Sequence, residues 1–244
     1  MASNRRFCRC VKTIKNTCPR CGCDHIKKNG TTRQDKQRYR CKECGRQFLF
    51  ALDYSYEAWN PFCRRLIVRM TLNGSGIRDI ARVLEISPTT VLRVLRQSAE
   101  QIPEPPIPSW LQDLEIDEQW SFVGRKKQQN WLWYGLNRQN GEIVAFVLGR
   151  RTDASCKKLT QKLAPCQVQN FYTDHWKSYP KFLNAKQHHI GKDGTQNIER
   201  KNLNFRTHLK RLQRRTICFS KSKQMHYNII KIYIHALNSN QHHF

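Results

Sequence analysis

The sequence predicts a mixed α/β protein built from three consecutive parts. Cysteines crowd the first 44 residues, a helical pattern of apolar residues covers about 57–99, and after a proline-rich stretch short strand-like runs alternate with helical ones. Such alternation indicates a sheet covered by helices, and 244 residues are enough for two or three small domains with cores of their own. We expect domains at 1–50, 57–99 and 112–240, with a linker at 100–111.

The charge of the chain indicates a polyanionic partner. Lys and Arg outnumber Asp and Glu by 44 to 18, a formal net charge of +26, and nucleic acid is the obvious candidate for that partner. A membrane surface also attracts cations, but apolar runs such as 143–148 have the length of a strand, not of a membrane-spanning helix. The N-terminus lacks the apolar core of a secretory signal. We therefore expect a protein of a reducing compartment, whose eleven cysteines hold metal or stay free thiols.

The cysteine-rich part contains two CxxC pairs, Cys18 with Cys21 and Cys41 with Cys44. Two such knuckles place four thiolates around one tetrahedral ion, and the residues between them suit a short hairpin. We therefore predict a zinc ribbon with structural Zn²⁺, because four thiolates leave no open position for catalysis. Cys23 is an alternative ligand to Cys21, while Cys8 and Cys10 have no partners with matching spacing, and these three stay unassigned.

The helical part predicts a helix-turn-helix. Its pattern breaks at 73–76 and 85–87, and Ser87 before Pro88 is a good N-cap and first helical position. The small and apolar residues expected in the three-helix core are Ile80, Ala81, Leu84, Ile86, Val91 and Leu95. The polar residues that the last helix presents to a DNA groove and its phosphates are Thr89, Thr90, Arg93 and Arg96. The alternative is a three-helix packing unit without DNA contact.

The last part predicts a sheet with helices. QIPEPPIPS at 101–109 carries four of the nine prolines and is typical of a stiff linker. Strand-like runs then cover 114–124, 131–137, 142–149 and 168–175. Asn140 and Gly141 predict a hairpin between the second and third. Helical patterns cover 153–165, about 196–214 and about 220–238. We expect the order β-β-β-α-β-α-β-α, a mixed five-stranded sheet flanked by helices.

Three acids fall where such a fold brings them together. Asp117 lies in the first strand pattern and Asp174 at the end of the fourth, so in neighbouring strands both face one cation, and Glu199 opens a helix that closes the site. Singly, each acid is more often a cap or a solvated counter-charge. Together they indicate magnesium, since Mg²⁺ prefers oxygen ligands and a buried carboxylate cluster needs a cation. We rank three other nearby acids lower. Glu115 and Glu118 are expected to be out of phase with Asp117 in the alternation of the strand, and Asp193 is expected to lie in a Gly-flanked turn.

The helix predicted at 196–214 carries a polar stripe. Glu199, Asn202, Arg206 and Lys210 recur at spacings that place them on one face. This stripe presents a metal ligand, an amide and two cations for phosphates. We therefore expect Asn202, Arg206 and Lys210 to contact DNA.

Several stretches together resemble the DDE transposases of the insertion sequence one family: IDEQW, WLWYGLNR, YTDHWKSYP and TQNIERKNLNFRTHLKRLQRR, preceded by TCPRC, RYRCKEC and GIRDIARVLEISPTTVLRVLR. The resemblance implies an RNase H-like catalytic domain in which Asp117, Asp174 and Glu199 hold Mg²⁺ or Mn²⁺ ions, with Asn202 and Arg206 in the motif after the Glu. Family members often join two reading frames near the linker, which implies a full-length fusion form here, either a natural fusion or an assembled sequence. The first ten residues are an extension relative to the family.

The function that this resemblance implies is DNA transposition, with double-stranded DNA as the partner of a cytoplasmic, nucleoid-associated protein of bacterial type. Such an enzyme binds the terminal inverted repeats of a transposon, frees a 3′ hydroxyl with a metal-activated water and transfers it into target DNA, both steps being two-metal phosphoryl transfers. A dimer or higher oligomer is expected because two ends must be held together. The alternatives are an RNase H-type nuclease without strand transfer and a DNA-binding regulator, although the presence of all three acids argues against the regulator.

Overall fold

The computed structural model describes residues 17–33, 36–50, 60–192 and 194–239. They belong to two compact units, one before Asn60 and one from Asn60 onward. Among these residues, no helix is both long and apolar enough to span a membrane.

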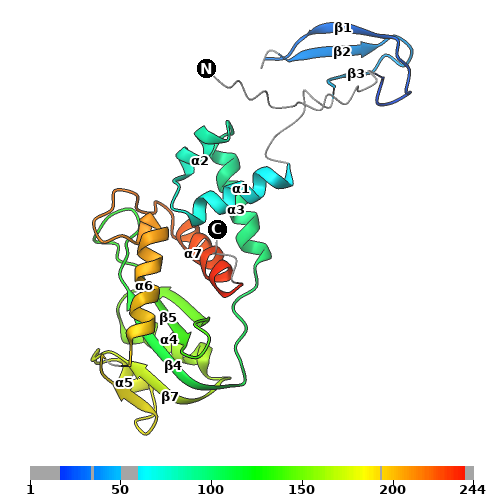
Figure 1. Cartoon of the computed structure of the whole chain (residues 1–244). Coiled ribbons are helices and arrows are strands. Elements are labelled where there is room, and N and C mark those ends of the chain that lie inside the picture. Colours follow the sequence, from blue (N-terminus) through cyan, green and yellow to red (C-terminus); the bar gives the residue numbers. More distant parts are fainter. Residues whose placement is uncertain (1–16, 34–35, 51–59, 193, 240–244) are drawn as a thin grey trace, which may run out of the picture. The chain divides into compact units, whose positions relative to one another are not determined.

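The first unit contains a small antiparallel sheet of three strands, β1 (Ile26–Thr31), β2 (Gln37–Cys41) and β3 (Gln47–Phe48) (Figure 1). A glycine follows each CxxC pair, and both Gly22 and Gly45 have φ of 72°, a left-handed conformation that favours glycine. Their N–H groups donate to the carbonyls of Cys18 and Cys41, so the chain turns back after each pair. These turns gather the thiols at one end of the sheet.

The second unit begins with three helices, α1 (Pro61–Leu72), α2 (Ile77–Val83) and α3 (Pro88–Gln101), at the positions that the sequence pattern predicts. Ser87 caps α3, because its Oγ accepts a hydrogen bond from the N–H of Thr90 at 3.0 Å and Pro88 occupies the first helical position. Ile80 and Leu95 are fully buried between the helices.

A mixed sheet of five strands follows: β4 (Trp110–Gln119), β5 (Trp131–Asn137), β6 (Ile143–Gly149), β7 (Gln167–Thr173) and β8 (His188–Ile190). Their order is β6-β5-β4-β7-β8, in which β6, β5 and β4 are antiparallel neighbours and β4, β7 and β8 run parallel. The predicted five-stranded mixed sheet is therefore confirmed, as is the pairing of the first and fourth strands. Strand β4 begins earlier than predicted, because Trp110 already pairs with Gln167 of β7.

The helices of this part are α4 (Asp153–Leu163), α5 (Tyr179–Phe182), α6 (Gln196–His208), the 3₁₀ turn η2 (Lys210–Leu212) and α7 (Lys223–Asn238). The prediction of one helix over 196–214 is wrong beyond His208. Leu209 leaves the helix with φ −111° and ψ 92°, and this turn buries Leu209 and Leu212 in the core. Lys210 therefore does not share the polar face of α6.

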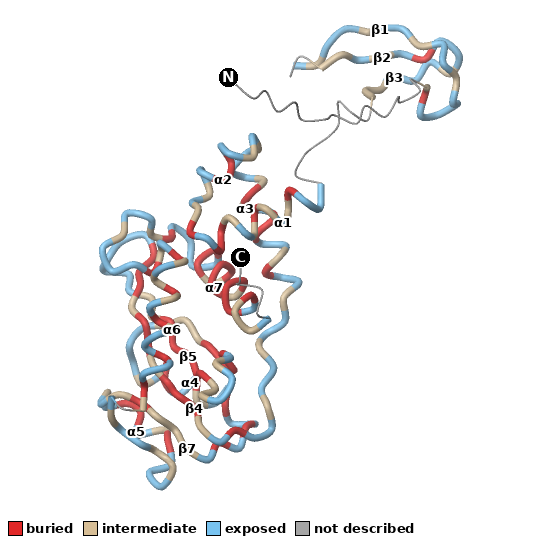
Figure 2. The backbone as a smooth tube through the Cα atoms, viewed as in Figure 1, coloured by how far each residue is buried: buried red, intermediate tan, exposed pale blue. Residues whose placement is uncertain are grey.

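The sheet is covered on both faces. One hydrophobic core lies under α4 and α5 and includes Ile116, Trp133 and Leu159. The other lies under α6 and α7 and continues into α1, α2 and α3, since Ile67 and Leu95 belong to the same buried cluster as Phe205, Ile229 and Tyr233. Figure 2 shows buried residues, in red, along α7 and in α3. The three N-terminal helices of this unit are therefore packed on the sheet domain through α3 and α7, although a proline-rich segment joins the two in the chain.

Candidate functional site

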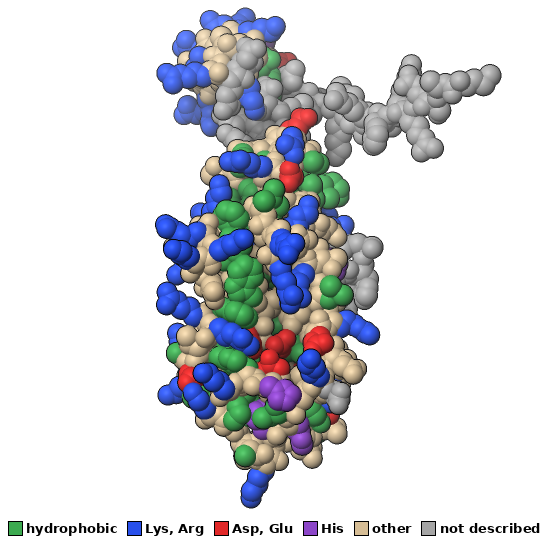
Figure 3. Space-filling view, turned by 90° about the vertical axis from the view of Figure 1, so that its left-hand side faces the viewer, with side chains coloured by type: hydrophobic (Ala, Val, Ile, Leu, Met, Phe, Trp, Pro, Cys, Tyr) green, Lys and Arg blue, Asp and Glu red, His purple; other side chains and the backbone are tan. Residues whose placement is uncertain are grey.

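A cleft of about 490 Å³ lies where β4 and β7 end. It is lined by four acidic side chains, four basic ones and three others: Asp117, Glu118, Asp174, Glu199, Arg151, Lys192, Arg206, Arg214, Trp131, Thr195 and Asn202. On the face drawn in Figure 3, acidic side chains gather at one place, with Lys and Arg side chains around them. The cleft thus brings together all three acids predicted from the sequence, along with Asn202 and Arg206.

The parallel pairing of β4 and β7 sets Asp117 beside Asp174. Ile116 is paired with Thr173, so the two aspartates occupy the next position on adjacent strands. Carboxylate oxygens of Asp117, Asp174 and Glu118 all lie within 4.8 Å of one another. Oδ1 of Asp174 accepts the N–H of Trp176 at 2.9 Å, which orients it at the strand end.

The electrostatics of these acids favour a bound cation. The pKa of Asp117 is raised to about 6, above all by burial and also by the charges of Asp174 and Glu199, against hydrogen bonds that lower it. Burial likewise raises the pKa of Glu118 to about 7. Oxygen donors in this arrangement are the ligands that magnesium and manganese prefer, so the donor set fits the ions that the sequence implies.

Glu199 reaches the cleft because α6 is anchored to β4. The buried carboxylate of Glu115 accepts the N–H of Ile198 at 2.7 Å and the side-chain amide of Asn197 at 3.0 Å, in the first turn of α6. Glu199 is exposed, and in the described part of the chain its carboxylate has no hydrogen bond or ion pair. The prediction that Glu115 is out of phase with Asp117 is wrong, because both point to the α6 face of β4. Glu115 is nevertheless absent from the cleft lining, since it binds the helix instead.

Glu118 is the acid that the sequence ranking undervalued. It points to the other face of β4, yet β4 ends here and its carboxylate still borders the cleft. Both of its oxygens are used within the protein: Oε1 accepts from Arg151 at 2.7 Å and Oε2 accepts from the hydroxyl of Tyr179. Asp193, the third rival acid, lies outside the described residues.

The polar stripe of α6 is shorter than predicted. Asn202 is only 5% exposed, and its amide donates to Oδ2 of Asp117 at 2.6 Å and accepts from the hydroxyl of Tyr134 at 3.0 Å. Its side chain is therefore occupied inside the protein and positions Asp117. Arg206 lines the cleft, whereas Lys210 lies beyond the helix and approaches the turn at Gly74.

Sequence reasoning missed three cations of the cleft: Arg151, Lys192 and Arg214. Each lies in a loop, where no periodic pattern signals which side chains face a site.

The four residues predicted for DNA contact on α3 divide into two groups. Thr89, Arg93 and Arg96 are exposed. Thr90 is half-buried, and its hydroxyl shares a hydrogen bond of 2.8 Å with Oγ of Ser87 in the helix cap. Three of the four side chains are thus available to a groove.

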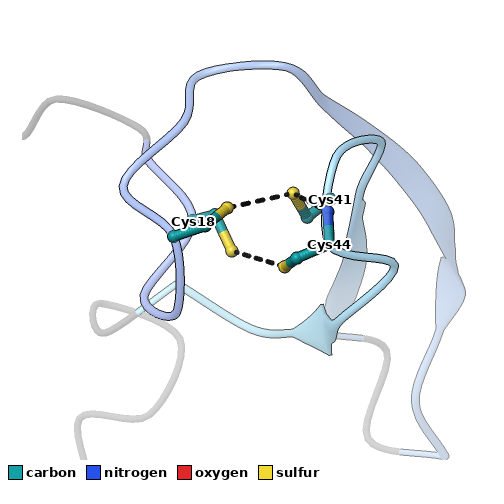
Figure 4. A group of neighbouring side chains, drawn as sticks. Cys18, Cys41 and Cys44 are labelled. Atoms are coloured by element: carbon teal, nitrogen blue, oxygen red, sulfur yellow. Dashed lines mark hydrogen bonds between the residues drawn. The ribbon is translucent and has the colours of Figure 1, made fainter.

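The predicted cysteine cluster forms in the first unit. Ligand atoms of Cys18, Cys21, Cys41 and Cys44 all lie within 4.8 Å of one another, and Figure 4 shows the Cys18, Cys41 and Cys44 side chains converging. The N–H of Cys44 donates to Sγ of Cys41 at 3.3 Å, and this hydrogen bond is the largest cause that lowers the pKa of the Cys41 thiol to about 6. Thiolate character suits a metal ligand.

Cys23 also lies close to this cluster, because its Sγ is 3.2 Å from that of Cys41. Cys8 and Cys10 lie outside the described residues.

Comparisons with known proteins agree with this arrangement. Residues 111–243 match the family model described as IS1 transposase, and residues 54–99 match the model described as InsA C-terminal domain. The insertion element iso-IS1n protein InsB of Shigella dysenteriae is 46% identical over 120 residues, which are 49% of this chain and 92% of that protein. The insertion element IS1 4 protein InsB of Escherichia coli (strain K12) is 45% identical over 120 residues, 72% of its length.

Among solved structures, a chain of the simian T-cell lymphotropic virus intasome in complex with PP2A regulatory subunit B56 gamma is similar with a TM-score of 0.36 and 13% identity. The match covers 68% of this chain and 66% of that one. The family model, in contrast, covers more than half of the chain, and the InsB relatives share close to half of their aligned residues with it. The chain therefore belongs to the IS1 transposase family, with a DNA-binding part ahead of its DDE part.

Proposed function

We propose that this protein binds the terminal inverted repeats of an insertion sequence and catalyses Mg²⁺-dependent strand cleavage and transfer of the 3′ hydroxyl into target DNA. The observation that carries the proposal is the meeting of Asp117, Asp174 and Glu199 in one cleft bordered by cations. Two divalent ions, when bound, activate the attacking oxygen and stabilise the leaving oxygen of an in-line displacement at phosphorus.

The state of each acid supports Glu199 as the third metal ligand. A carboxylate oxygen of Glu118 lies within 4.8 Å of oxygens of Asp117 and Asp174. However, the Glu118 carboxylate already accepts hydrogen bonds from Arg151 and Tyr179. Among the residues that the structure describes, the carboxylate of Glu199 has no partner, and it lies on a helix that Glu115 holds against β4. Arg206, Arg214 and Lys192 then provide positive charge for the phosphates that approach these acids.

The other two parts of the chain serve DNA binding in this proposal. Helix α3 presents Thr89, Arg93 and Arg96 to the groove of the terminal repeat. The four-cysteine cluster holds a structural Zn²⁺, which replaces a hydrophobic core in a unit of short strands. The active form is a dimer or higher oligomer, so that two ends are held together.

A joining assay tests the proposal. The protein is incubated with Mg²⁺ and labelled DNA that carries the terminal repeats of its own element, and 3′-end joining to a plasmid is measured. Joining is expected for the natural protein and for Glu100→Gln, which removes an exposed carboxylate from α3, and it is expected to fall by at least about 1000-fold in Glu199→Gln. Cleavage without joining indicates a nuclease instead, binding without cleavage indicates a regulator, and full joining by Glu199→Gln removes that residue from the site.

A further inference from the structure

Arg151 is held at the border of the cleft by a buried carboxylate. Its Nε lies 2.7 Å and its Nη2 2.5 Å from Oε1 of Glu118, whose side chain is only 2% exposed. Oε2 of the same carboxylate accepts the hydroxyl of Tyr179, which is itself fully buried. Glu118 is therefore fixed from two sides and fixes the guanidinium in turn.

Two indole rings hold the same guanidinium. Cζ of Arg151 lies 5.0 Å from the ring centroid of Trp131 and 5.1 Å from that of Trp176, distances at which a cation is attracted to an aromatic face. Trp176 is packed in turn against Trp133 and Tyr179, with centroids 4.9 Å and 5.6 Å away. This arrangement reduces the motion of a side chain that is usually flexible, so that little rotamer entropy is left to lose when it binds a ligand.

The guanidinium has more donors than its contact with Glu118 uses. Arginine has five N–H donors, and Glu118 takes up two of them. The Arg151 side chain is 38% exposed and lines the same cleft as Asp117, Asp174 and Glu199. In the described part of the chain its remaining N–H groups have no acceptor.

A counter-ion for Glu118 alone does not require this geometry. Neutralising a buried carboxylate needs only the ion pair, and either indole alone is enough to cover the stem. Two rings and a carboxylate together hold the guanidinium at the lining of the cleft, where an acceptor with two oxygens fits its remaining donors best. In a cleft for DNA, that acceptor is a backbone phosphate.

We propose that Arg151 binds one backbone phosphate of the DNA strand that enters the cleft, and that Glu118, Trp131 and Trp176 position it for this contact. The inference rests on the proposed function, because it needs DNA in this cleft. Arg151 follows β6, whereas Lys192, Arg206 and Arg214 come from the segment around α6. The contact therefore gives the strand a second attachment point, from a different part of the sheet.

A chemical substitution in the DNA tests this contact directly. Terminal-repeat DNA with a free 3′ end is prepared with a single neutral methylphosphonate at each of the phosphates near that end in turn. Binding is measured for the natural protein, Arg151→Ala and Arg150→Ala. The buffer contains Ca²⁺, and this measurement does not depend on the joining reaction. Arg150 is the matched control, because it is the preceding arginine, is exposed and does not line the cleft.

The expected result is one phosphate position at which neutralisation weakens binding by the natural protein and by Arg150→Ala on the order of 10-fold. Arg151→Ala binds unmodified DNA more weakly by a similar factor and loses nothing further at that position. If Arg151→Ala keeps the full sensitivity at every position, the proposal is overturned. A natural protein that binds DNA with this signature but does not join it leaves the contact intact and refutes the proposed function instead.

A second variant guards against misfolding. Arg151→Ala leaves the buried Glu118 without its cation, so the double variant Glu118→Gln with Arg151→Ala is measured in parallel. It removes the unpaired charge together with the arginine. The same loss of sensitivity at the same phosphate is expected, and a return of that sensitivity in the double variant contradicts the proposal.

Discussion

The replacement Asp117→Asn is expected to stabilise the protein in the absence of magnesium and to remove most of its response to magnesium. Asp117 is packed between β4 and α6, and its carboxylate lies beside those of Asp174 and Glu118. Without a cation this charge is confined in a poorly solvated site. An asparagine keeps the shape and accepts the same hydrogen bond from Asn202, but it carries no charge.

The magnitude follows from the pKa of Asp117. Burial above all, helped by the charges of Asp174 and Glu199, raises this pKa from 3.8 to about 6. A carboxyl pKa that is higher in the folded than in the unfolded state means that the folded state binds the proton more tightly. The free energy of unfolding therefore falls as pH rises from about 4 to about 6, and above that window the ionised group costs about 3 kcal/mol.

The assay is urea or thermal unfolding at about pH 7.5, in magnesium-free buffer and in millimolar MgCl₂. In magnesium-free buffer we expect Asp117→Asn to be more stable than the natural protein by about 3 kcal/mol, which corresponds to roughly 6 to 12 °C in Tm for a chain of this size. Magnesium is expected to stabilise the natural protein and Glu100→Gln, and to have a much smaller effect on Asp117→Asn.

Two outcomes refute this reasoning. If Asp117→Asn is less stable than the natural protein without magnesium, the surroundings of Asp117 do not disfavour its ionised carboxylate. If magnesium stabilises both proteins equally, Asp117 does not hold the ion. Glu100→Gln separates these outcomes from a general effect of charge, because Glu100 is exposed on α3.

Three further predictions concern other parts of the chain. Cys44→Ser, or removal of zinc by a strong chelator, is expected to unfold the cysteine unit and leave the second unit folded, which two-dimensional NMR resolves residue by residue. His226 is buried, and this burial is the main reason that its pKa is lowered to about 3. Because the unfolded state then binds the proton at higher pH than the folded state, the free energy of unfolding falls as pH drops below about 6.5, by about 2 kcal/mol at pH 5. This prediction is contradicted if the stability of His226→Gln falls with pH as steeply as that of the natural protein. Asn202→Ala removes the hydrogen bond to Asp117 and is expected to lower the joining rate by on the order of 10- to 100-fold, whereas Asn204→Ala, on the same helix and outside the cleft lining, is expected to leave it unchanged in the same assay.

The sequence was informative where structure depends on local spacing. The structure confirms the predicted strands β5 and β6, the helix α4, the cap at Ser87 and the turn at Gly141. Each of these features depends on residues within a few positions of one another. The two CxxC pairs belong to the same class, since each knuckle is a local turn.

Elements that depend on distant partners were predicted less well. Strand β4 starts at Trp110 because β7 offers a neighbour there, and α6 ends at His208 because the core accepts Leu209 and Leu212. The continuous core of α3 and α7 joins segments more than a hundred residues apart, so the pattern in either helix shows an apolar face without showing its partner.

For the site, the positions of Asp117, Asp174 and Glu199 in the predicted strands and helix selected them among the available acids, and the resemblance to a family supported the same choice. The tertiary structure alone decided how each acid is used. Glu115 anchors α6, Glu118 holds Arg151, and only Glu199 keeps a free carboxylate beside the two aspartates in the described chain. The reason is physical: a carboxylate has the same chemistry at every position in a sequence, and only its neighbours in space determine whether it binds a helix, a cation or a metal ion.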